Sequence, residues 1–288
     1  MAVRTNLLIL PSVENIEEMV KGISNSIDFT EGKFSRVEFI FKDNEVQLLY
    51  EGVDLRKFSS VWLSSFWGSR DLAYAVKLYL DHFEIQHTYV EKSVSKITDQ
   101  VEFVLNNIVV PDTFFVDTRN ITDYIEKIEK ICSYPLVIKD IKGARGKYSA
   151  YIKNRNELLA KFSELPKHRK YLFQNFIPNE YDWGVLVVDG EIVSAEKSYP
   201  KSGEFRNNAC NGAKEVFVET KDIPKPVQEM ASEASKSLGL SWSRSDIIVD
   251  KNTNVPYLLE VNRCPGITSG TSEVTGAQYF LKSCLNLM

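Results

Sequence analysis

Along the first part of the chain, short apolar runs alternate with stretches in which apolar residues recur at helical spacing. The apolar runs predict strands at residues 2–10, 36–41, 45–50, 60–63 and 85–90. The helical spacing predicts helices at residues 13–23 and 71–83. Strands that alternate with helices in this order indicate an α/β lobe with a largely parallel sheet.

The rest of the chain is organised differently, because predicted hairpins are interleaved with predicted helices. Apolar runs predict strands at residues 135–139, 149–152, 171–175, 183–188, 191–195, 242–249 and 256–261. Helical spacing predicts helices at residues 95–105, 122–131, 157–162, 225–238 and 272–285. Asp189-Gly190, between two of the strand-like runs, favours a tight hairpin turn. With 288 residues, the chain exceeds what one hydrophobic core usually holds, so we expect more than one lobe.

The overall composition excludes several classes of function. The formal net charge is −4, with acidic and basic residues mixed along the chain, which does not favour a nucleic-acid or anionic-membrane surface. No apolar run is long enough to cross a bilayer, and the apolar N-terminal stretch predicts a first strand rather than a signal peptide. The four cysteines are scattered, so neither a zinc site nor a disulfide framework is expected, and a cytoplasmic location is the simpler context.

The strongest candidate for chemistry is a set of oxygen-bearing side chains on two predicted strands near the C-terminus. Glu260 and Asn262 are two residues apart, so they share one face of an extended strand. Asp246 lies in the apolar strand upstream, where a carboxylate is costly to bury without a partner. Oxygen ligands of this kind suit a hard cation such as Mg²⁺. We interpret Asp246, Glu260 and Asn262 as metal ligands, and the alternative is a surface edge strand.

A glycine-rich loop between two predicted strands carries a cluster of cations. Gly143 and Gly146 allow backbone N–H groups to approach a phosphate closely, and Arg145 and Lys147 would neutralise its charge. Lys139, at the end of the preceding strand, is expected to reach the nucleotide that carries this phosphate. The alternative is an exposed hairpin tip, since the loop matches neither the Walker A pattern nor the dinucleotide-binding fingerprint.

Further candidate ligand contacts lie between this loop and the metal strands. Gln174-Asn175-Phe176-Ile177 is an apolar edge that turns sharply, and such an edge offers backbone groups to an adenine, with Glu180 as a partner for the ribose. Arg206 and Lys197 are candidate cations for a transferring phosphoryl group, and Asp182 is a further polar group on the same lobe. The alternative is an inter-lobe connection with solvated charges.

Together, these residues resemble the ATP-grasp superfamily and, within it, the RimK-type carboxylate–amine ligases. The resemblance covers nearly the whole chain in order. Gly203-Glu204-Phe205-Arg206-Asn207-Asn208 is close to the family's G-E-F-R-x-N element. Glu260-Val261-Asn262-Arg263-Cys264-Pro265-Gly266 matches its E-V-N-x-x-P-G signature. The strand that ends at Lys139, the glycine-rich loop and residues 107–113 are similar to further family elements.

The resemblance implies a three-lobed ATP-grasp architecture that combines α/β and α+β lobes. An N-terminal α/β lobe would occupy residues 1–93, a central ATP-grasp lobe residues 94–170, and a C-terminal ATP-grasp lobe residues 171–288. ATP would lie between the last two lobes.

The resemblance also implies a reaction in which ATP phosphorylates a carboxylate and an amine then displaces phosphate from the acylphosphate. Lys139 and the glycine-rich loop would hold the phosphates of ATP. Arg206, with Lys197, would stabilise the acylphosphate and its tetrahedral successor. Asp246, Glu260 and Asn262 would hold two Mg²⁺ ions, with Mn²⁺ as a substitute.

Several positions depart from the family pattern. Gln100 stands where a second nucleotide lysine is usual, Tyr148 where the loop commonly has a third glycine, and Gly184 where Asp-x-Arg places a cation on the acceptor side. The leading prediction is an amide- or peptide-bond-forming ligase for small-molecule or peptide substrates, with no nucleic-acid or membrane partner.

Other interpretations stay open at this point. One is a graspetide-type ligase that closes lactams or lactones on a precursor peptide, and another is a D-alanine–D-alanine-like dipeptide ligase. A synapsin-like module that binds ATP without turnover is the non-enzymatic alternative. Relatives often form dimers or tetramers, so a homo-oligomer is an open alternative to a monomer.

Overall fold

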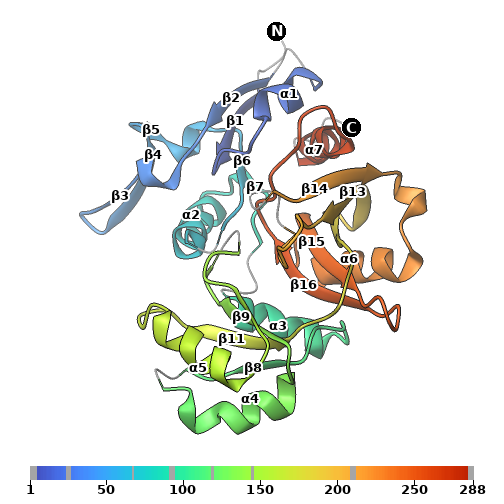
Figure 1. Ribbon diagram of the computed structural model, residues 1–288. Helices are drawn as coiled ribbons and strands as arrows, with labels where there is room; N and C mark the ends of the chain where they lie inside the picture. Colours follow the sequence, from blue (N-terminus) through green and yellow to red (C-terminus); the bar gives the residue numbers. More distant parts are fainter. Residues whose placement is uncertain are drawn as a thin grey trace.

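The computed structural model describes residues 5–23, 27–66, 68–90, 95–117, 120–143, 146–207 and 212–284. Within these residues, the sheets follow one another along the chain as an N-terminal, a central and a C-terminal lobe (Figure 1). None of the helices in this part of the chain is long and apolar enough to cross a membrane.

The N-terminal lobe is built on a parallel sheet in which β1 (Thr5–Leu10) lies between β2 (Ile27–Glu31) and β6 (Ser60–Leu63). The predicted parallel sheet is confirmed. The strand predicted at residues 85–90 is shorter, as β7 (Gln86–His87), and β2 was not predicted. The last four residues of β1, from Leu7 to Leu10, are apolar because their successive side chains enter the hydrophobic clusters on opposite faces of the sheet. The lobe also contains α1 (Ile16–Lys21), α2 (Arg70–His82), β3 (Val37–Lys42), β4 (Glu45–Tyr50) and β5 (Val53–Asp54).

The central lobe is an antiparallel sheet. Its strand order is β10 (Ala150–Ile152), β9 (Leu136–Asp140), β11 (Tyr171–Asn175) and β8 (Thr113–Phe115). Its helices are α3 (Lys96–Leu105), α4 (Ile125–Cys132) and α5 (Arg155–Glu164). Leu172 of β11 pairs with Lys139 and with Phe115, so β11 belongs to the central sheet. This corrects the expectation that the C-terminal lobe begins at residue 171, because local sequence pattern does not encode which distant strand a segment will pair with.

The C-terminal lobe is a second antiparallel sheet, whose two faces have different partners. Its strand order is β14 (Lys214–Val218), β13 (Glu191–Tyr199), β12 (Asp182–Val188), β15 (Trp242–Val249) and β16 (Pro256–Asn262). Trp183, Val185 and Val187 face α6 (Lys225–Ser237). Leu186 and Val188 face the opposite way, toward α7 (Ser272–Cys284).

The N-terminal and C-terminal lobes share one hydrophobic cluster. The ring centroid of Trp62 lies 5.5 Å from that of Trp242 and 5.2 Å from that of Phe280. Helix α7 also contacts α1, and Figure 1 shows these helices side by side although they come from opposite ends of the chain. The two lobes are therefore packed as one body, which fixes the C-terminal sheet against the N-terminal lobe.

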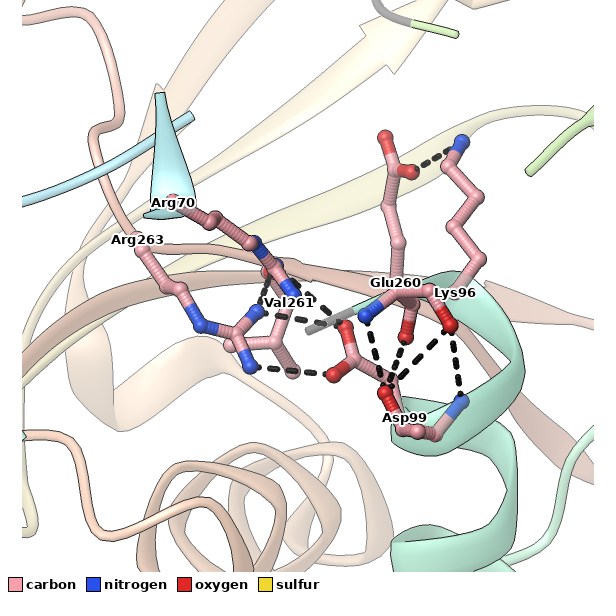
Figure 2. Close-up of polar contacts among 8 residues, drawn as sticks. Arg70, Lys96, Asp99, Glu260, Val261 and Arg263 are labelled. Carbon is pink, nitrogen blue, oxygen red and sulfur yellow. Dashed lines mark hydrogen bonds and ion pairs between the residues drawn. The ribbon is translucent and has the colours of Figure 1, made fainter. Parts of the chain in front are cut away.

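A buried ionic cluster joins all three lobes at one point (Figure 2). Asp99, in the first turn of α3, lies 2.9 Å (Oδ1–Nη2) and 3.2 Å (Oδ2–Nη1) from Arg263, which follows β16. Arg70, the first residue of α2, places its Nη2 3.7 Å from Asp99 Oδ2. All three side chains are buried, so the Coulomb attraction is little screened by water. We refer to Arg70, Asp99 and Arg263 as the inter-lobe ionic cluster.

The inter-lobe ionic cluster predicts a large loss of stability for Asp99→Asn. The substitution leaves the Arg70 and Arg263 guanidinium groups buried without the carboxylate, which should cost about 3–5 kcal/mol. Thermal unfolding followed by circular dichroism measures the effect. A matched control is Glu229→Gln, which removes an exposed carboxylate 3.4 Å from Lys225 and should change stability by at most about 1 kcal/mol. Equal melting temperatures for Asp99→Asn and the wild type would contradict this role.

Candidate functional site

A cavity lies between the central sheet and the C-terminal sheet. Its volume is about 120 Å³, and it is lined by both polar and apolar side chains. Its walls come from β9 and β11 on one side and from β15 and β16 on the other. Many residues that the sequence singled out meet here: Lys139, Gly146, Gln174, Asn175, Phe176, Ile177, Asp182, Arg206, Asp246 and Glu260.

One part of the cavity is apolar. Its aliphatic walls are Val137, Ile177, Ile248 and Leu259. Gln174 donates from Nε2 to Thr113 Oγ1 over 2.9 Å, and its Oε1 is buried without a hydrogen-bond partner among the described residues. Because a buried acceptor without a partner is costly, the site favours a ligand that brings a donor. An apolar slot with one such acceptor suits a purine ring that carries an amino group.

The polar part of the cavity contains carboxylates on adjacent strands. Asp246 of β15 is the cross-strand partner of Glu260 of β16, and Asn262 donates from Nδ2 to Asp246 Oδ2 over 3.0 Å. Burial raises the pKa of Asp246 well above its ordinary value, and the charge of Glu260 raises it further. Burial also opposes the charge of Glu260, but Lys96, with help from Lys139, outweighs burial and lowers the pKa of this carboxyl.

This donor set fits a magnesium ion that is shared with a nucleotide. The described residues contain no group of three or more His, Cys, Asp or Glu side chains that is placed to hold a metal, so a cage made by protein carboxylates alone is not present in this part of the chain. Mg²⁺ is usually held by one or two carboxylates together with phosphates and water. A divalent cation at Asp246 and Glu260 would also offset the repulsion that raises the pKa of Asp246.

Lysine side chains of the central lobe face these carboxylates. Burial lowers the pKa of Lys139 to about 8, and the charge of Lys96 adds to the effect. The Nζ of Lys96 lies 2.7 Å from Glu260 Oε2, and Figure 2 shows the two side chains pointing toward each other. Lys96 begins α3 one turn before Gln100, whose Oε1 instead lies 3.5 Å from Thr113 Oγ1. A lysine of α3 therefore reaches the cavity even though position 100 has none.

The structure describes only part of the glycine-rich loop, and Arg145 lies outside the described residues. Gly146 lines the cavity with a φ of 67°, and a Cβ on Gly143 would lie 3.1 Å from the backbone oxygen of Lys147. Lys147 is exposed, and its Nζ lies 5.2 Å from the ring of Tyr148. Tyr148 has a φ of 62°, which is the left-handed region that glycine adopts at least cost.

Arg206 bridges the C-terminal lobe and the glycine-rich loop. Its Nε and Nη2 donate to the Glu204 carboxylate over 2.9 and 2.7 Å, and its Nη1 donates to the carbonyl oxygen of Gly146 over 3.2 Å. The hydrogen bonds from Arg206 lower the pKa of Glu204 to about 2. A guanidinium fixed in this way at the cavity wall is placed to face an anionic ligand.

Asp182 lines the same cavity, where Asn179 donates to its Oδ1 over 2.8 Å and Asn207 donates to the same oxygen. Burial raises the pKa of Asp182 to about 7, although Asn207 and Lys139 oppose the rise. Glu180 is exposed and is not among the described residues that line the cavity, so the structure offers Asp182 or Asn179 in its place near a ligand.

The structure corrects the interpretation of Lys197 as a second cation for a transferring phosphoryl group. Lys197 pairs across strands with Trp183, so both side chains leave the sheet on the α6 side, away from the cavity. Its Nζ lies 4.9 Å from the Trp183 ring and 4.5 Å from the Tyr181 ring. The physical reason is the two-residue period of a strand, which puts the neighbouring Glu196 on the opposite face.

Glu196 fills the space that Gly184 leaves open. Gly184 pairs with Glu196 on one side and with Asp246 on the other, and a Cβ on Gly184 would lie 2.0 Å from Glu196 Oε1. Arg244 Nη2 lies 3.5 Å from this oxygen and also contacts Glu273. A guanidinium is thus present near the position where the Asp-x-Arg pattern would supply one, but it comes from the next strand and is paired with carboxylates.

Lys96, Glu196 and Arg244 were not singled out from the sequence. For Lys96 a signal existed, because it lies on the same face of the predicted helix as Gln100, one turn earlier. For Glu196 and Arg244 the signal is the register of β12 with its neighbours, which becomes available only from the structure.

Comparisons with known proteins identify a family for this chain. A family model described as a RimK-like ATP-grasp domain matches residues 96–280. A protein named probable alpha-L-glutamate ligase, from Legionella pneumophila (strain Corby), is 28% identical over 183 residues, which cover 62% of this chain and 58% of that protein. The chain therefore spans less than two thirds of this relative. A D-alanine–D-alanine ligase from Clostridium acetobutylicum is 31% identical over 157 residues, which cover 51% of this chain and 46% of that protein.

Solved structures support the fold. The ATP-grasp ligase PsnB, complexed with a phosphomimetic variant of its minimal precursor, Mg and ADP, matches with a TM-score of 0.67 and 14% identity. The match covers 98% of this chain and 99% of that chain. The expected multi-lobed ATP-grasp architecture is confirmed.

The raised pKa of Glu196 predicts a pH-dependent effect of Glu196→Gln on stability. Burial raises the pKa of Glu196 from 4.5 to about 7, although Arg244 opposes the rise. The folded protein therefore keeps a proton that the unfolded chain loses, and the contribution of Glu196 to stability falls as pH rises from about 4.5 to 7. Glutamine is neutral throughout, so the melting temperature of the variant relative to the wild type should rise between pH 5 and pH 8.

Differential scanning fluorimetry across this pH range checks the prediction. Glu233→Gln, at an exposed position of α6, makes the same chemical change away from Arg244 and Asp246 and serves as the control. A difference between Glu196→Gln and the wild type that is constant across the range would contradict the raised pKa.

Proposed function

Because the chain belongs to the family of RimK-like ATP-grasp domains, we propose that it is an ATP-dependent carboxylate–amine ligase that forms an amide or peptide bond through an acylphosphate. The observation that carries the proposal is one cavity in which an apolar slot adjoins Lys139, Arg206 and the carboxylate pair Asp246–Glu260. These are the parts that a phosphoryl-transfer site needs: a base slot, phosphate cations and metal ligands.

The nucleotide would lie along the length of the cavity. Its base would occupy the slot beside Gln174 and Ile177, and Lys139 would face its phosphates. Asp246 and Glu260, with Asn262, would hold two Mg²⁺ ions, and Mn²⁺ would be able to replace Mg²⁺. When bound, the metal would supply charge neutralisation for the phosphates and polarise the transferred phosphoryl group.

The reaction has two steps. An oxygen of the substrate carboxylate attacks the terminal phosphorus of ATP, the bond to the bridging oxygen breaks, and ADP leaves. The amine then attacks the carbonyl carbon of the acylphosphate, the carbon–oxygen bond to phosphate breaks, and the amine nitrogen loses a proton. Arg206, held by Glu204 against the carbonyl oxygen of Gly146, would face the charge that develops on the phosphoryl oxygens.

The similar proteins named above are a probable alpha-L-glutamate ligase, a D-alanine–D-alanine ligase and PsnB, an ATP-grasp ligase complexed with a variant of its minimal precursor. The Glu196–Arg244 pair in place of a cation at position 184 favours an acceptor different from that of a standard glutamate ligase. We therefore infer small-molecule or peptide substrates, with a graspetide-type peptide-modifying ligase as the second candidate.

We infer a cytoplasmic protein from its thiols. Cys132 and Cys264 are free cysteines among the described residues, and burial raises the pKa of both thiols, which makes them less reactive. Free thiols of this kind are usual in a reducing compartment.

The function predicts ADP release that depends on ATP, on a divalent metal and on both substrates. A coupled ADP assay with Mg²⁺ and ATP, screened against amino acids, dipeptides and peptides, measures it. Asp246→Asn and Glu260→Gln should each lower this rate by two or more orders of magnitude, because each removes a metal oxygen at the site of phosphoryl transfer. Melting temperatures near that of the wild type would show that the fold survives. Wild-type turnover in either variant would contradict the metal assignment.

Arg206→Ala should separate chemistry from nucleotide binding. Since Arg206 is expected to act on charge that develops during transfer, kcat should fall by roughly 10²–10³, whereas the KM for ATP should change only a few-fold. Steady-state kinetics with the substrate pair from the screen measures both values. The opposite pattern, a normal kcat with lost ATP affinity, would show that Arg206 binds the nucleotide instead.

A further inference from the structure

Lys96 forms an ion pair with Glu260, a residue that we propose as a metal ligand. It is the first residue of α3, directly after the N-cap Ser95. Its Nζ lies 2.7 Å from Glu260 Oε2, and the side chains of Lys96 and Glu260 are only 16% and 26% exposed. Both residues line the cavity together with Lys139. Figure 2 shows that Lys96 extends away from the inter-lobe ionic cluster and toward the Glu260 carboxylate.

An ammonium group at this position competes with a metal ion. A metal bound to Glu260 lies about 2.0–2.1 Å from a carboxylate oxygen, so a lysine that stayed 2.7 Å from the same carboxylate would face a divalent charge at short range. In a partly buried site this repulsion is only weakly screened. Either the metal or Lys96 therefore binds Glu260 weakly while the other is in place.

The same cavity offers Lys96 a second partner. If Glu260 holds a metal that neutralises the phosphates of a nucleotide, those phosphates would lie close to this carboxylate and to Lys96. The flexible stem of Lys96 starts at a fixed helix end, so a short swing moves its ammonium group from Glu260 to a neighbouring phosphate. Lys139 faces the same region from β9, and its pKa is lowered to about 8 by burial and by the charge of Lys96, so the two ammonium groups repel when no anion lies between them.

We propose that Lys96 and the metal ion compete for Glu260, and that Lys96 exchanges this carboxylate for a nucleotide phosphate when nucleotide and metal bind together. The proposal rests on the proposed function, because it takes the cavity to be a metal–nucleotide site. It makes Lys96 a binding residue that discourages metal binding in the absence of nucleotide and strengthens nucleotide binding in its presence. The fixed alternative, in which Lys96 stays on Glu260 and merely orients it for the metal, predicts the opposite sign for metal binding.

Lys96→Met tests the two roles separately, because methionine keeps a flexible apolar stem and removes the charge. Titration of the protein with Mn²⁺ alone, followed by electron paramagnetic resonance, should show Mn²⁺ binding at least about threefold more tightly in the variant, since a competing cation is gone. Isothermal titration with ADP in saturating Mg²⁺ should show binding roughly tenfold or more weaker, since a charged hydrogen bond to phosphate is lost.

Lys161→Met is the matched control, because it removes a lysine that pairs with Glu164 on α5 and should leave both affinities at the wild-type values. A melting temperature for Lys96→Met near that of the wild type confirms that the comparison concerns folded protein. Weaker Mn²⁺ binding in Lys96→Met would overturn the competition and establish the orienting role. Unchanged ADP affinity would overturn the exchange onto phosphate. A wild-type protein that bound no ADP in Mg²⁺ would overturn the proposed function as well, which distinguishes that failure from the others.

Discussion

The geometry of the site depends on the inter-lobe ionic cluster. Arg263 follows Asn262 directly in the chain, and its guanidinium is fixed to Asp99 of α3 and, through it, to Arg70 of α2. The end of β16, the strand that carries Glu260 and Asn262, is therefore tied to the same helix that carries Lys96. A carboxylate between two buried guanidinium groups is held firmly, because removing it would leave uncompensated charge in the interior. The packing of all three lobes in this way sets the positions of the backbones from which the side chains of Lys96 and Glu260 extend.

The two-residue period of the C-terminal sheet decides which side chains meet the ligand. On β12, Asp182 faces the cavity and Trp183 faces the core beneath α6. On β13, Glu196 lies on the face of Asp182 and Lys197 lies on the face of Trp183. The register of β12 with β13 and β15 places Gly184 between Glu196 and Asp246, and the Glu196 carboxylate occupies the space that a side chain at position 184 would need. A shift of one residue in any of these strands would exchange the polar and apolar sets.

The sequence was sufficient for those features that depend on local pattern. Glu260 and Asn262 lie on one strand, and the hairpin at Asp189-Gly190 needs only its own turn residues. The predictions that were wrong, and the features that were not predicted, depend on contacts between distant segments. Asp99 and Arg263 are 164 residues apart, and nothing near either residue indicates the other. Likewise, β11 joined the central sheet through pairings with β8 and β9. Lys197 was misplaced because the face of a strand residue is fixed only when the register and the core side are known.

In the proposed function, the charges of the cavity would couple the binding of a nucleotide to the binding of metal ions. Among the described lining residues, the carboxylates of Asp182, Asp246 and Glu260 face the ammonium groups of Lys96 and Lys139, while Arg206 is paired with Glu204. A triphosphate adds several negative charges to a site that already contains buried carboxylates with raised pKa values. The desolvation cost of burying that charge without a metal would exceed the Coulomb attraction between the phosphates and the lysines. Divalent cations at Asp246 and Glu260, as we propose, would remove the repulsion on both sides at once, so the affinities for metal and nucleotide would be coupled by the electrostatics of this cavity.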